Sequence, residues 1–354
     1  MIPRFLLFVF SLLGVITSHS ADSRPLSDTV VVDEQTERII RGGLKYLAAH
    51  QGPSGAFEGN SDQERRHPVA MTAYTLMAFQ AAGNLPGEGE FGKTVRSAMQ
   101  YLLDSVQADG IIGDREDNKY MYSHGVAAIA LAELYGQTKS PVIRPKLERM
   151  VNVILGSQND DRQDFDFGGW RYRPISSDAD ISVTVLQVVA LRGAKNAGLN
   201  VPQKILDNAV IYIKRCYEPA QGGFVYRPQD RYKGAGFART AAAIYSLQVC
   251  GLYDDPLVKR GSQYMLSHLD DRLWFTYGNF YAAPALYMAG GEAWKKYYNY
   301  TRNFLVKNAR QRGDAFYWEA NLDRERGNEG PLYNTAVYTK ILAMPYHYIP
   351  LYQR

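Results

Sequence analysis

The sequence predicts an all-α fold in which about six pairs of helices form an α/α toroid, with an inner ring of helices inside an outer ring. Helical segments of two kinds alternate with a period of about fifty residues, and a Gly-aromatic loop joins the two members of several pairs. Six pairs is the number that closes known rings of this kind, and no unit resembles a polar terminal cap. A closed ring is therefore favoured over an open solenoid.

The first helix of each pair is amphipathic, because apolar residues recur at intervals of three and four with charged residues between them. We expect these helices to form the outer ring, with one solvated face each. In chain order they are ERIIRGGLKYLAAHQ (37–51), VRSAMQYLLDSVQ (95–107), LERMVNVILGSQ (147–158), LDNAVIYIKRCY (206–217), VKRGSQYMLSHL (258–269) and YYNYTRNFLVKNAR (297–310).

The second helix of each pair carries few charges and should be buried on most sides, which assigns it to the inner ring. Several of these helices end in glycine, which favours a left-handed C-cap at Gly83, Gly136, Gly198 and Gly251. The inner segments are AMTAYTLMAFQAAG (70–83), SHGVAAIALAELYG (123–136), ISVTVLQVVALRGAKNAG (181–198), ARTAAAIYSLQVCG (238–251), FYAAPALYMAGG (280–291) and LYNTAVYTKILAM (332–344).

The N-terminus has the pattern of a secretory signal peptide over residues 1–20. Arg4 precedes an apolar run from Phe5 to Ile16, and Ser18 and Ser20 precede a plausible cut before Ala21. We expect cleavage and export to the periplasm or the exterior. The alternative is a retained anchor, but a dozen apolar residues fall short of the roughly twenty that span a membrane. Residues 21–34 form a polar leader, and residues 35–354 form a single toroid domain.

Composition excludes several classes of partner. The net charge is only +4 and no block of consecutive Lys and Arg occurs, so nucleic acid is not an expected partner. Cys216 and Cys250 fall at opposite ends of a helix layer, on the order of 20 Å apart at 1.5 Å per residue, which is too far for a disulfide. We expect two buried free thiols, no metal site and no cofactor.

The Gly-aromatic loops carry a recurring motif. LAAHQGPSGAF contains Gln51, Gly55 and Phe57, and related sets occur in LLDSVQADGIIG, LGSQNDDRQDFDFGGW and QGGFVYRP. This pattern resembles the QW motif of squalene and oxidosqualene cyclases and the repeats of protein prenyltransferase β-subunits, over about residues 36–350. The resemblance implies the toroid fold. The Gln and the aromatic residue would mainly tie neighbouring repeats together.

The stretch DADIS, at the start of the third inner helix, matches part of the acidic motif of class II terpene cyclases through Asp178, Asp180 and Ser182. The resemblance implies that Asp180 is the general acid that protonates an alkene. The last aspartate of the family motif is Ile181 here, which removes one activating carboxylate. The alternative is that these aspartates only cap the helix, since Asp is a preferred N-cap residue. The sequence leaves both roles open.

The N-terminal ends of the inner helices should surround one mouth of the ring, where binding sites usually lie. Alignment of the inner helices places Thr72, His124, Thr184, Thr240 and Thr335 at one depth. His124 is a candidate base or ligand group there, or a satisfied packing residue. The loops add the candidate ligand-binding residues Tyr122, Trp170, Tyr172, Arg173, Tyr226, Arg227, Arg239, Tyr281, Tyr333 and Asn334.

Two functions follow as hypotheses. The first is an exported toroid that binds a small molecule, glycan or peptide at its mouth without full cyclase chemistry. The second is an enzyme, either a terpene cyclase or isomerase that uses Asp180, or a carbohydrate-active toroid that pairs Asp180 with Glu319 or Asp323. Zinc-dependent prenyl transfer is disfavoured because no cysteine lies near Asp178 or Asp180 at the family's spacing. A thioester motif is absent from the sequence.

Overall fold

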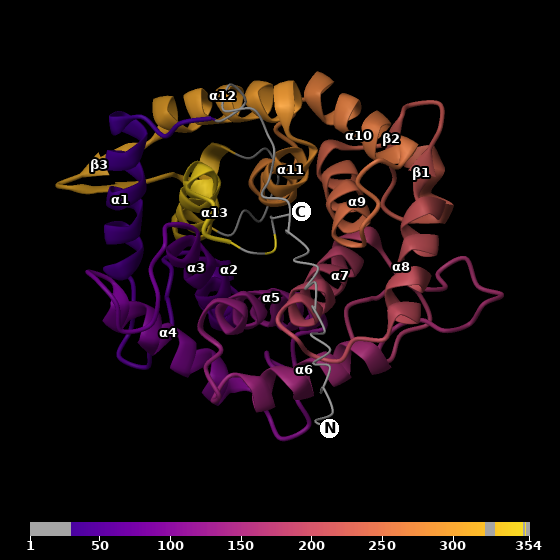
Figure 1. Ribbon diagram of the computed structural model, residues 1–354, viewed down its shortest axis with the longest axis horizontal. Helices are drawn as coiled ribbons and strands as arrows, with labels where there is room; N and C mark the ends of the chain where they lie inside the picture. Colours follow the sequence, from indigo (N-terminus) through magenta and orange to yellow (C-terminus); the bar gives the residue numbers. More distant parts are fainter. Residues whose placement is uncertain (1–29, 323–329, 350, 352–354) are drawn as a thin grey trace, which may run out of the picture.

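The computed structural model describes residues 30–322, 330–349 and 351. The expected signal peptide, most of the expected leader and Asp323 lie outside these described residues. Helices alternate along the chain between two concentric rings (Figure 1). The inner ring consists of α3 (Pro68–Ala81), α5 (Met121–Thr138), α7 (Ile181–Asn196), α9 (Phe237–Val249), α11 (Phe275–Ala289) and α13 (Pro331–Ala343).

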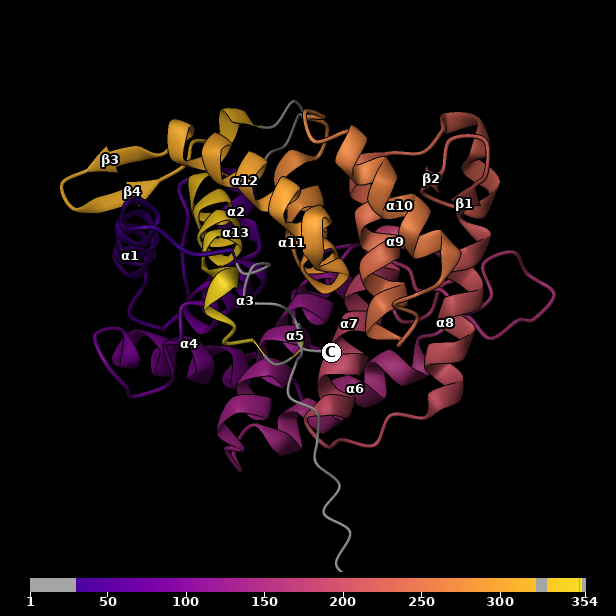
Figure 2. The same ribbon diagram turned by 45° about the horizontal axis from the view of Figure 1, so that its top comes forward.

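The outer ring surrounds the inner one. It consists of α1 (Glu34–Ala48), α4 (Gly92–Ser105), α6 (Arg144–Gly156), α8 (Gln203–Arg215), α10 (Pro256–Ser267) and α12 (Gly291–Asn308), and a short helix, α2 (Asp62–Arg66), precedes α3. Each inner helix packs on the next one along the chain, and α13 packs on α3. Contacts of α1 with α13 join the first and last pairs, so the ring is closed (Figure 2). The predicted all-α toroid is confirmed.

The two rings differ in burial as the sequence patterns predict. Nearly every side chain of α3 and α7 is buried, whereas α1 and α4 bury one face each. Gly83, Gly198 and Gly251 adopt left-handed φ values of 78°, 96° and 91°, and each follows the end of an inner helix. The expected cap at Gly136 is wrong. The helix continues through this glycine to Thr138 and ends on Lys139, which has a φ of 50°.

Two short hairpins interrupt the helices. Strands β1 (Tyr217–Glu218) and β2 (Gly223–Phe224) pair in one, and β3 (Arg310–Arg312) and β4 (Ala315–Tyr317) pair in the other. The extended piece GGFVYRP contains β2, as the sequence indicates. The β3–β4 hairpin has no counterpart among the predicted elements.

Glutamine side chains connect neighbouring inner helices. Gln80, Gln187 and Gln248 each donate a hydrogen bond of 3.0–3.2 Å to a backbone carbonyl of an adjacent inner helix. Because each of these glutamines is fully buried, these bonds form in a weakly polar environment where they are strong. They hold the inner helices at fixed relative positions around the axis.

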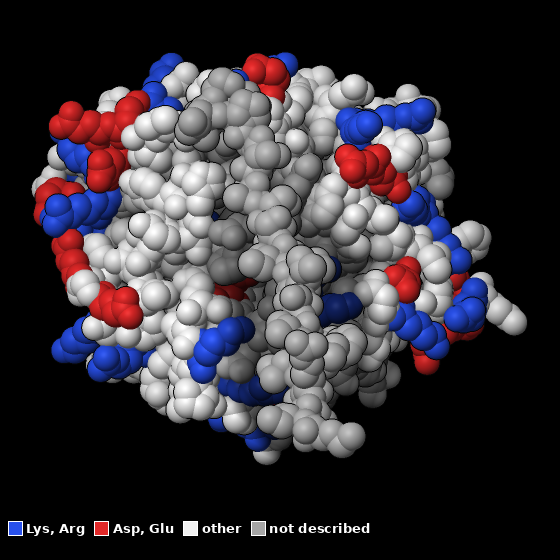
Figure 3. Space-filling view, viewed as in Figure 1, with Lys and Arg blue, Asp and Glu red and all other residues white. Residues whose placement is uncertain are grey.

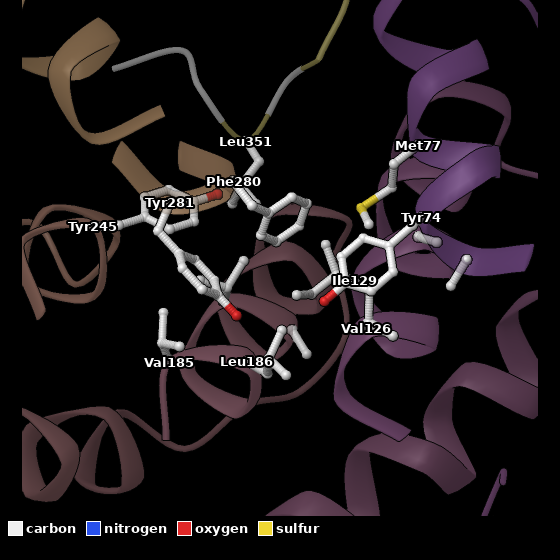
Figure 4. Packing of buried hydrophobic residues seen from close by; sticks show 14 of the residues in the cluster. Tyr74, Met77, Val126, Ile129, Val185, Leu186, Tyr245, Phe280, Tyr281 and Leu351 are labelled. Atoms are coloured by element: carbon white, nitrogen blue, oxygen red, sulfur yellow. The ribbon is translucent and has the colours of Figure 1, made fainter. Parts of the chain in front are cut away.

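Aromatic side chains fill the middle of the ring. Residues of five inner helices converge around the axis, among them Tyr74, Tyr245, Phe280 and Tyr281 (Figure 4). The rings of Tyr74 and Phe280 meet edge to face with their centroids 5.0 Å apart, an arrangement that aromatic pairs favour. The Tyr277 hydroxyl donates a 3.0 Å hydrogen bond to the carbonyl of Ser182 on α7, which connects α11 with a helix that is not its neighbour in the ring.

Charged side chains of both signs are interspersed around the edge of the face in Figure 3, in keeping with the small net charge. Among the described residues, no helix has the length and apolar character needed to cross a membrane. Cys216 and Cys250 are free, as expected, although Cys250 is only partly buried.

Candidate functional site

Asp180 is the N-cap residue of α7 and is fully buried. Its Oδ1 atom accepts hydrogen bonds from the Val183 backbone N–H at 2.9 Å and from the Ser182 hydroxyl at 2.5 Å, and its Oδ2 atom is paired with the Arg171 guanidinium. Both oxygens of this carboxyl group are therefore engaged by partners within the protein. Asp180 caps the helix.

A chain of ion pairs extends outward from this carboxylate. Arg171 Nε lies 3.1 Å from an Asp178 oxygen, and Arg227 reaches the same Asp178 oxygen at 3.4 Å. Arg227 also contacts Asp166 at 3.3 Å, and Gln229 donates to Asp166 at 3.1 Å. Burial raises the pKa of Asp166 although Arg227 opposes the shift. Asp178 thus bridges two arginines from successive repeats.

Tyrosines from three repeats surround these charges. The hydroxyl groups of Tyr172 and Tyr226, which occupy equivalent positions in the sequences RYRP and VYRP, lie 2.7 Å apart. The Arg171 guanidinium lies 3.9 Å from the Tyr172 ring centroid, and the Tyr122 hydroxyl lies 2.5 Å from that of Ser182. Burial, followed by the nearby charge of Asp180, raises the pKa of Tyr226, so this phenol stays protonated at neutral pH.

His124 lies in the first turn of α5, and its side chain is directed towards the outer helix α6. It is fully buried, its Nδ1 accepts a bond from the Ile112 backbone N–H at 3.3 Å, and its Nε2 lies 3.1 Å from the Met150 carbonyl oxygen. Burial lowers its pKa to about 4, so it is neutral at physiological pH. The satisfied histidine that the sequence allowed is what the structure contains.

The four threonines aligned with His124 each accept a hydrogen bond from a loop backbone N–H, as His124 does. Each hydroxyl accepts a hydrogen bond of 2.9–3.2 Å from the backbone N–H of the aromatic residue in the preceding loop. The pairs are Thr72 with Phe57, Thr184 with Trp170, Thr240 with Phe224, and Thr335 with Trp318. This set of bonds fixes the loop of each repeat to its own inner helix.

Other candidates occupy different places. Trp170 is buried and its indole donates to the Ile154 carbonyl at 2.8 Å, and Asn334 is buried between α11 and the Glu319 carbonyl. These two residues pack the repeats together and do not face the mouth. Tyr281 and Tyr333 are buried in the aromatic cluster near the axis. Arg239, at the start of α9, donates a hydrogen bond to the backbone carbonyl of Gly234. The backbone carbonyl of Arg173 accepts a hydrogen bond from the Ser176 hydroxyl.

A cleft of about 260 Å³ lies between the first and second repeats, at the N-terminal ends of α3 and α5. It is lined by His67 before α3, by Asp114, Asp117 and Ser123 around the start of α5, and by Tyr101 of the outer helix α4. The Nδ1 atom of His67 lies 3.6 Å from an Asp117 oxygen, and both side chains are partly exposed. The lining therefore offers hydroxyl, imidazole and carboxylate groups to a ligand.

Sequence reasoning missed Arg171 and this cleft. Arg171 has no equivalent in the VYRP loop, where Val225 takes its place, so the repeat comparison did not select it. His67 and Asp117 are fifty residues apart and belong to no shared motif. The described residues contain no group of His, Cys, Asp and Glu side chains suited to a metal ion.

No protein-family model matches the sequence, and no curated protein matches it either. Solved structures do match. The GH76A α-1,6-mannanase of Salegentibacter sp. HEL1_6 is similar with a TM-score of 0.64 and 8% identity, over 89% of this chain and 99% of that chain. Cellobiose 2-epimerase from Bacillus thermoamylovorans B4167 is similar with a TM-score of 0.63 and 12% identity, over 86% and 97%.

A variant of the type II terpene cyclase MstE from Scytonema, in complex with the substrate geranylgeranyl dihydroxybenzoate, is also similar. Its TM-score is 0.57 and its identity 13%, over 89% of this chain and 98% of that chain. At these identities the likeness concerns the fold. The neighbours are α/α toroids, and they include a terpene cyclase, in keeping with the fold that the resemblance of the repeats implies.

Proposed function

We propose that the protein is an exported toroid that binds a carbohydrate at its mouth and lacks the proton-donor chemistry of the terpene cyclases. The observation that carries the proposal is the polar cleft beside His67, Asp117 and Ser123. Carbohydrates present many hydroxyl groups, and a cleft with several hydrogen-bonding side chains and one tyrosine, Tyr101, suits them better than it suits an isoprenoid chain.

The state of Asp180 argues against cyclase chemistry. A proton donor to an alkene must be an unusually strong acid that faces its substrate, and it must hold its proton at the start of the reaction. Here Arg171, Ser182 and Val183 engage both oxygens of the carboxyl group, and the side chain is fully buried. A carboxyl group held in this way does not face a substrate.

The compared proteins support a carbohydrate as the ligand class. An inactive variant of the Salegentibacter mannanase is described in complex with α-1,6-mannotriose, and a second similar toroid is a cellobiose epimerase. Export is supported by the N-terminal pattern of Arg4, the apolar run to Ile16 and Ser20, which is typical of a cleaved signal peptide. An exported toroid would meet glycans outside the cytoplasm.

The test is a screen of the mature chain against an array of oligosaccharides, followed by calorimetry with the best ligand. We expect saturable binding that weakens at least tenfold in Asp117→Asn. Asp109→Asn is the matched control. Like Asp117, Asp109 accepts a hydrogen bond from a backbone N–H two residues later and pairs with a basic side chain, which is Arg115 for Asp109 and His67 for Asp117. Asp109 does not line the cleft. Equal binding by the two variants, or cyclic products from squalene that vanish in Asp180→Asn, would contradict the proposal.

A further inference from the structure

The opposite end of the ring, at the C-termini of the inner helices, is covered by the last described residues of the chain. We call residues 344–349 and 351 the C-terminal strap. His347 has a left-handed φ of 61° and its imidazole is bonded to the Tyr287 hydroxyl of α11. Tyr348 lies against Gly83 at the end of α3, where an added Cβ would meet the Tyr348 ring at 2.7 Å.

The end of the strap reaches the interior of the ring. Ile349 and Leu351 are only 5% and 4% exposed, and Leu351 belongs to the same buried cluster as Phe280 and Tyr281 (Figure 4). The backbone N–H of Leu351 donates a hydrogen bond to the Glu133 carboxyl group of α5. The strap therefore contacts α3, α5 and α11 after leaving α13.

Two ionisable residues, Glu133 and Lys340, are buried where the strap enters the interior of the ring. Val126, Ile129 and Glu133 follow one another at helical spacing on α5, so Glu133 faces the axis one turn beyond the two apolar residues. Glu133 is 5% exposed and its Oε2 atom has no hydrogen-bond partner. Lys340 of α13 is 4% exposed, and its Nζ lies 3.7 Å from the Phe280 ring centroid.

Burial of the Glu133 and Lys340 side chains is energetically unfavourable, and the strap could pack against apolar residues without them. An isolated carboxyl group inside a protein is unfavourable unless a donor satisfies it, and here a backbone N–H of the strap supplies that donor. An acceptor for a main-chain N–H beside apolar packing for the same residue's side chain is chemistry that can recognise a peptide through its backbone and one side chain. Burial raises the pKa of Glu133 to about 8.

We propose that this end of the ring is a second binding site, distinct from the mouth, which takes a peptide segment with a leucine-like side chain. The chain's own C-terminal strap is its occupant. Leu351 fills the apolar part of the site and Glu133 accepts the backbone N–H. When the strap is released, the site becomes available to a peptide of similar sequence.

The test is binding in trans. A variant that ends at Tyr346 is mixed with a labelled peptide of sequence HYIPLYQR, which corresponds to residues 347–354, and fluorescence anisotropy is measured. We expect saturable binding to the truncated chain and at least tenfold weaker binding to the full chain, whose site is filled. A peptide with Asp in place of leucine should bind at least tenfold more weakly than the original.

A second substitution distinguishes specific binding at Glu133 from nonspecific binding to apolar surface that the truncation exposes. In the truncated chain, Glu133→Leu should weaken peptide binding at least tenfold, whereas Glu148→Leu on the outer helix α6 should leave it unchanged. Equal effects of these two variants, or no binding by a folded truncated chain, would overturn the proposal.

Should the truncated chain fail to fold, the full chain with Leu351→Asp replaces it. We expect this variant to fold and to bind the peptide that the native chain excludes. If it folds and excludes the peptide, or if neither variant folds, the strap is an integral part of the core and the proposal is wrong.

Discussion

Asp180 and Asp178 lie two residues apart but differ in burial and partners. Asp180 is fully buried between a helix N-terminus and Arg171, whereas the Asp178 side chain is 35% exposed between two arginines. Removal of one partner from a buried pair leaves the other charge uncompensated, and exposed pairs contribute little. We expect Asp180→Asn to lower the free energy of unfolding by about 2–4 kcal/mol and Asp178→Asn by about 0–1 kcal/mol. Urea unfolding measures both, and equal losses would contradict this assignment.

His124 should make the protein sensitive to acid. Its pKa is about 4 in the folded chain, against an ordinary value of 6.5, so the unfolded chain binds a proton that the folded chain does not. The stabilisation is present above pH 6.5 and is lost as the pH falls towards 4. Replacement with threonine, the residue at this position in four other repeats, removes the titrating group. Between pH 7 and pH 5 we expect the native chain to lose roughly 2 kcal/mol more than His124→Thr in urea unfolding. Parallel pH profiles would show that this histidine is not the titrating group.

Each repeat is an outer helix, a loop and an inner helix, and the structure fixes the loop to the inner helix through one hydroxyl group. Thr184→Val keeps the side-chain shape but leaves the buried N–H of Trp170 without its acceptor. We expect a loss of about 1–3 kcal/mol in the free energy of unfolding. Thr75→Val is the matched control, because the Thr75 hydroxyl is buried without a partner, and this change should be neutral or stabilising. If Thr75→Val destabilises the protein as much as Thr184→Val does, the hydrogen bond between Thr184 and Trp170 is not the cause of the loss.

The elements were predictable because burial follows helical period. The alternation of half-charged and almost uncharged segments gave both rings and their order, and residue spacing alone aligned His124 with Thr72 and Thr184. The end of α5 was not predictable from Gly136, because packing continues the helix past a residue that often ends one. The β3–β4 hairpin was missed because its strands are three residues long and carry no alternating pattern.

The candidate site was predictable only where it repeats. Tyr172 and Tyr226 share a motif, and their hydroxyl groups meet. Arg171 and the cleft beside His67 and Asp117 depend on how separate repeats face one another, and a single sequence carries no signal for such contacts. The role of Asp180 was left open between a cap and an acid, and its partners in three dimensions were needed to distinguish them.

At the scale of the whole molecule, the buried pair of Glu133 and Lys340 should give the stability a minimum near pH 7–8. Burial raises the pKa of Glu133 from 4.5 to about 8, so the unfolded chain releases a proton across this range and stability falls. Burial lowers the pKa of Lys340 from 10.5 to about 7, so stability rises again at higher pH.

This pH dependence can be tested with Glu133→Gln, which keeps the shape and an acceptor oxygen but does not titrate. Between pH 5 and pH 7 the native chain should lose stability relative to the variant, by on the order of a few kcal/mol. Glu148→Gln, at an exposed site on α6, should follow the native chain. If Glu133→Gln shows the same dependence of unfolding free energy on pH as the native chain, the Glu133 carboxyl group does not control that dependence.

The central claim is that the mouth of the ring, and not its aromatic interior, holds the ligand. Hydrogen exchange of the mature chain with and without its best oligosaccharide tests this most directly, since a bound ligand slows exchange where it contacts the protein. We predict slower exchange in residues 66–69 and 113–123, which surround the cleft, with no change in residues 344–349 of the strap. Slower exchange confined to the strap, or to the outer helices, would contradict the claim.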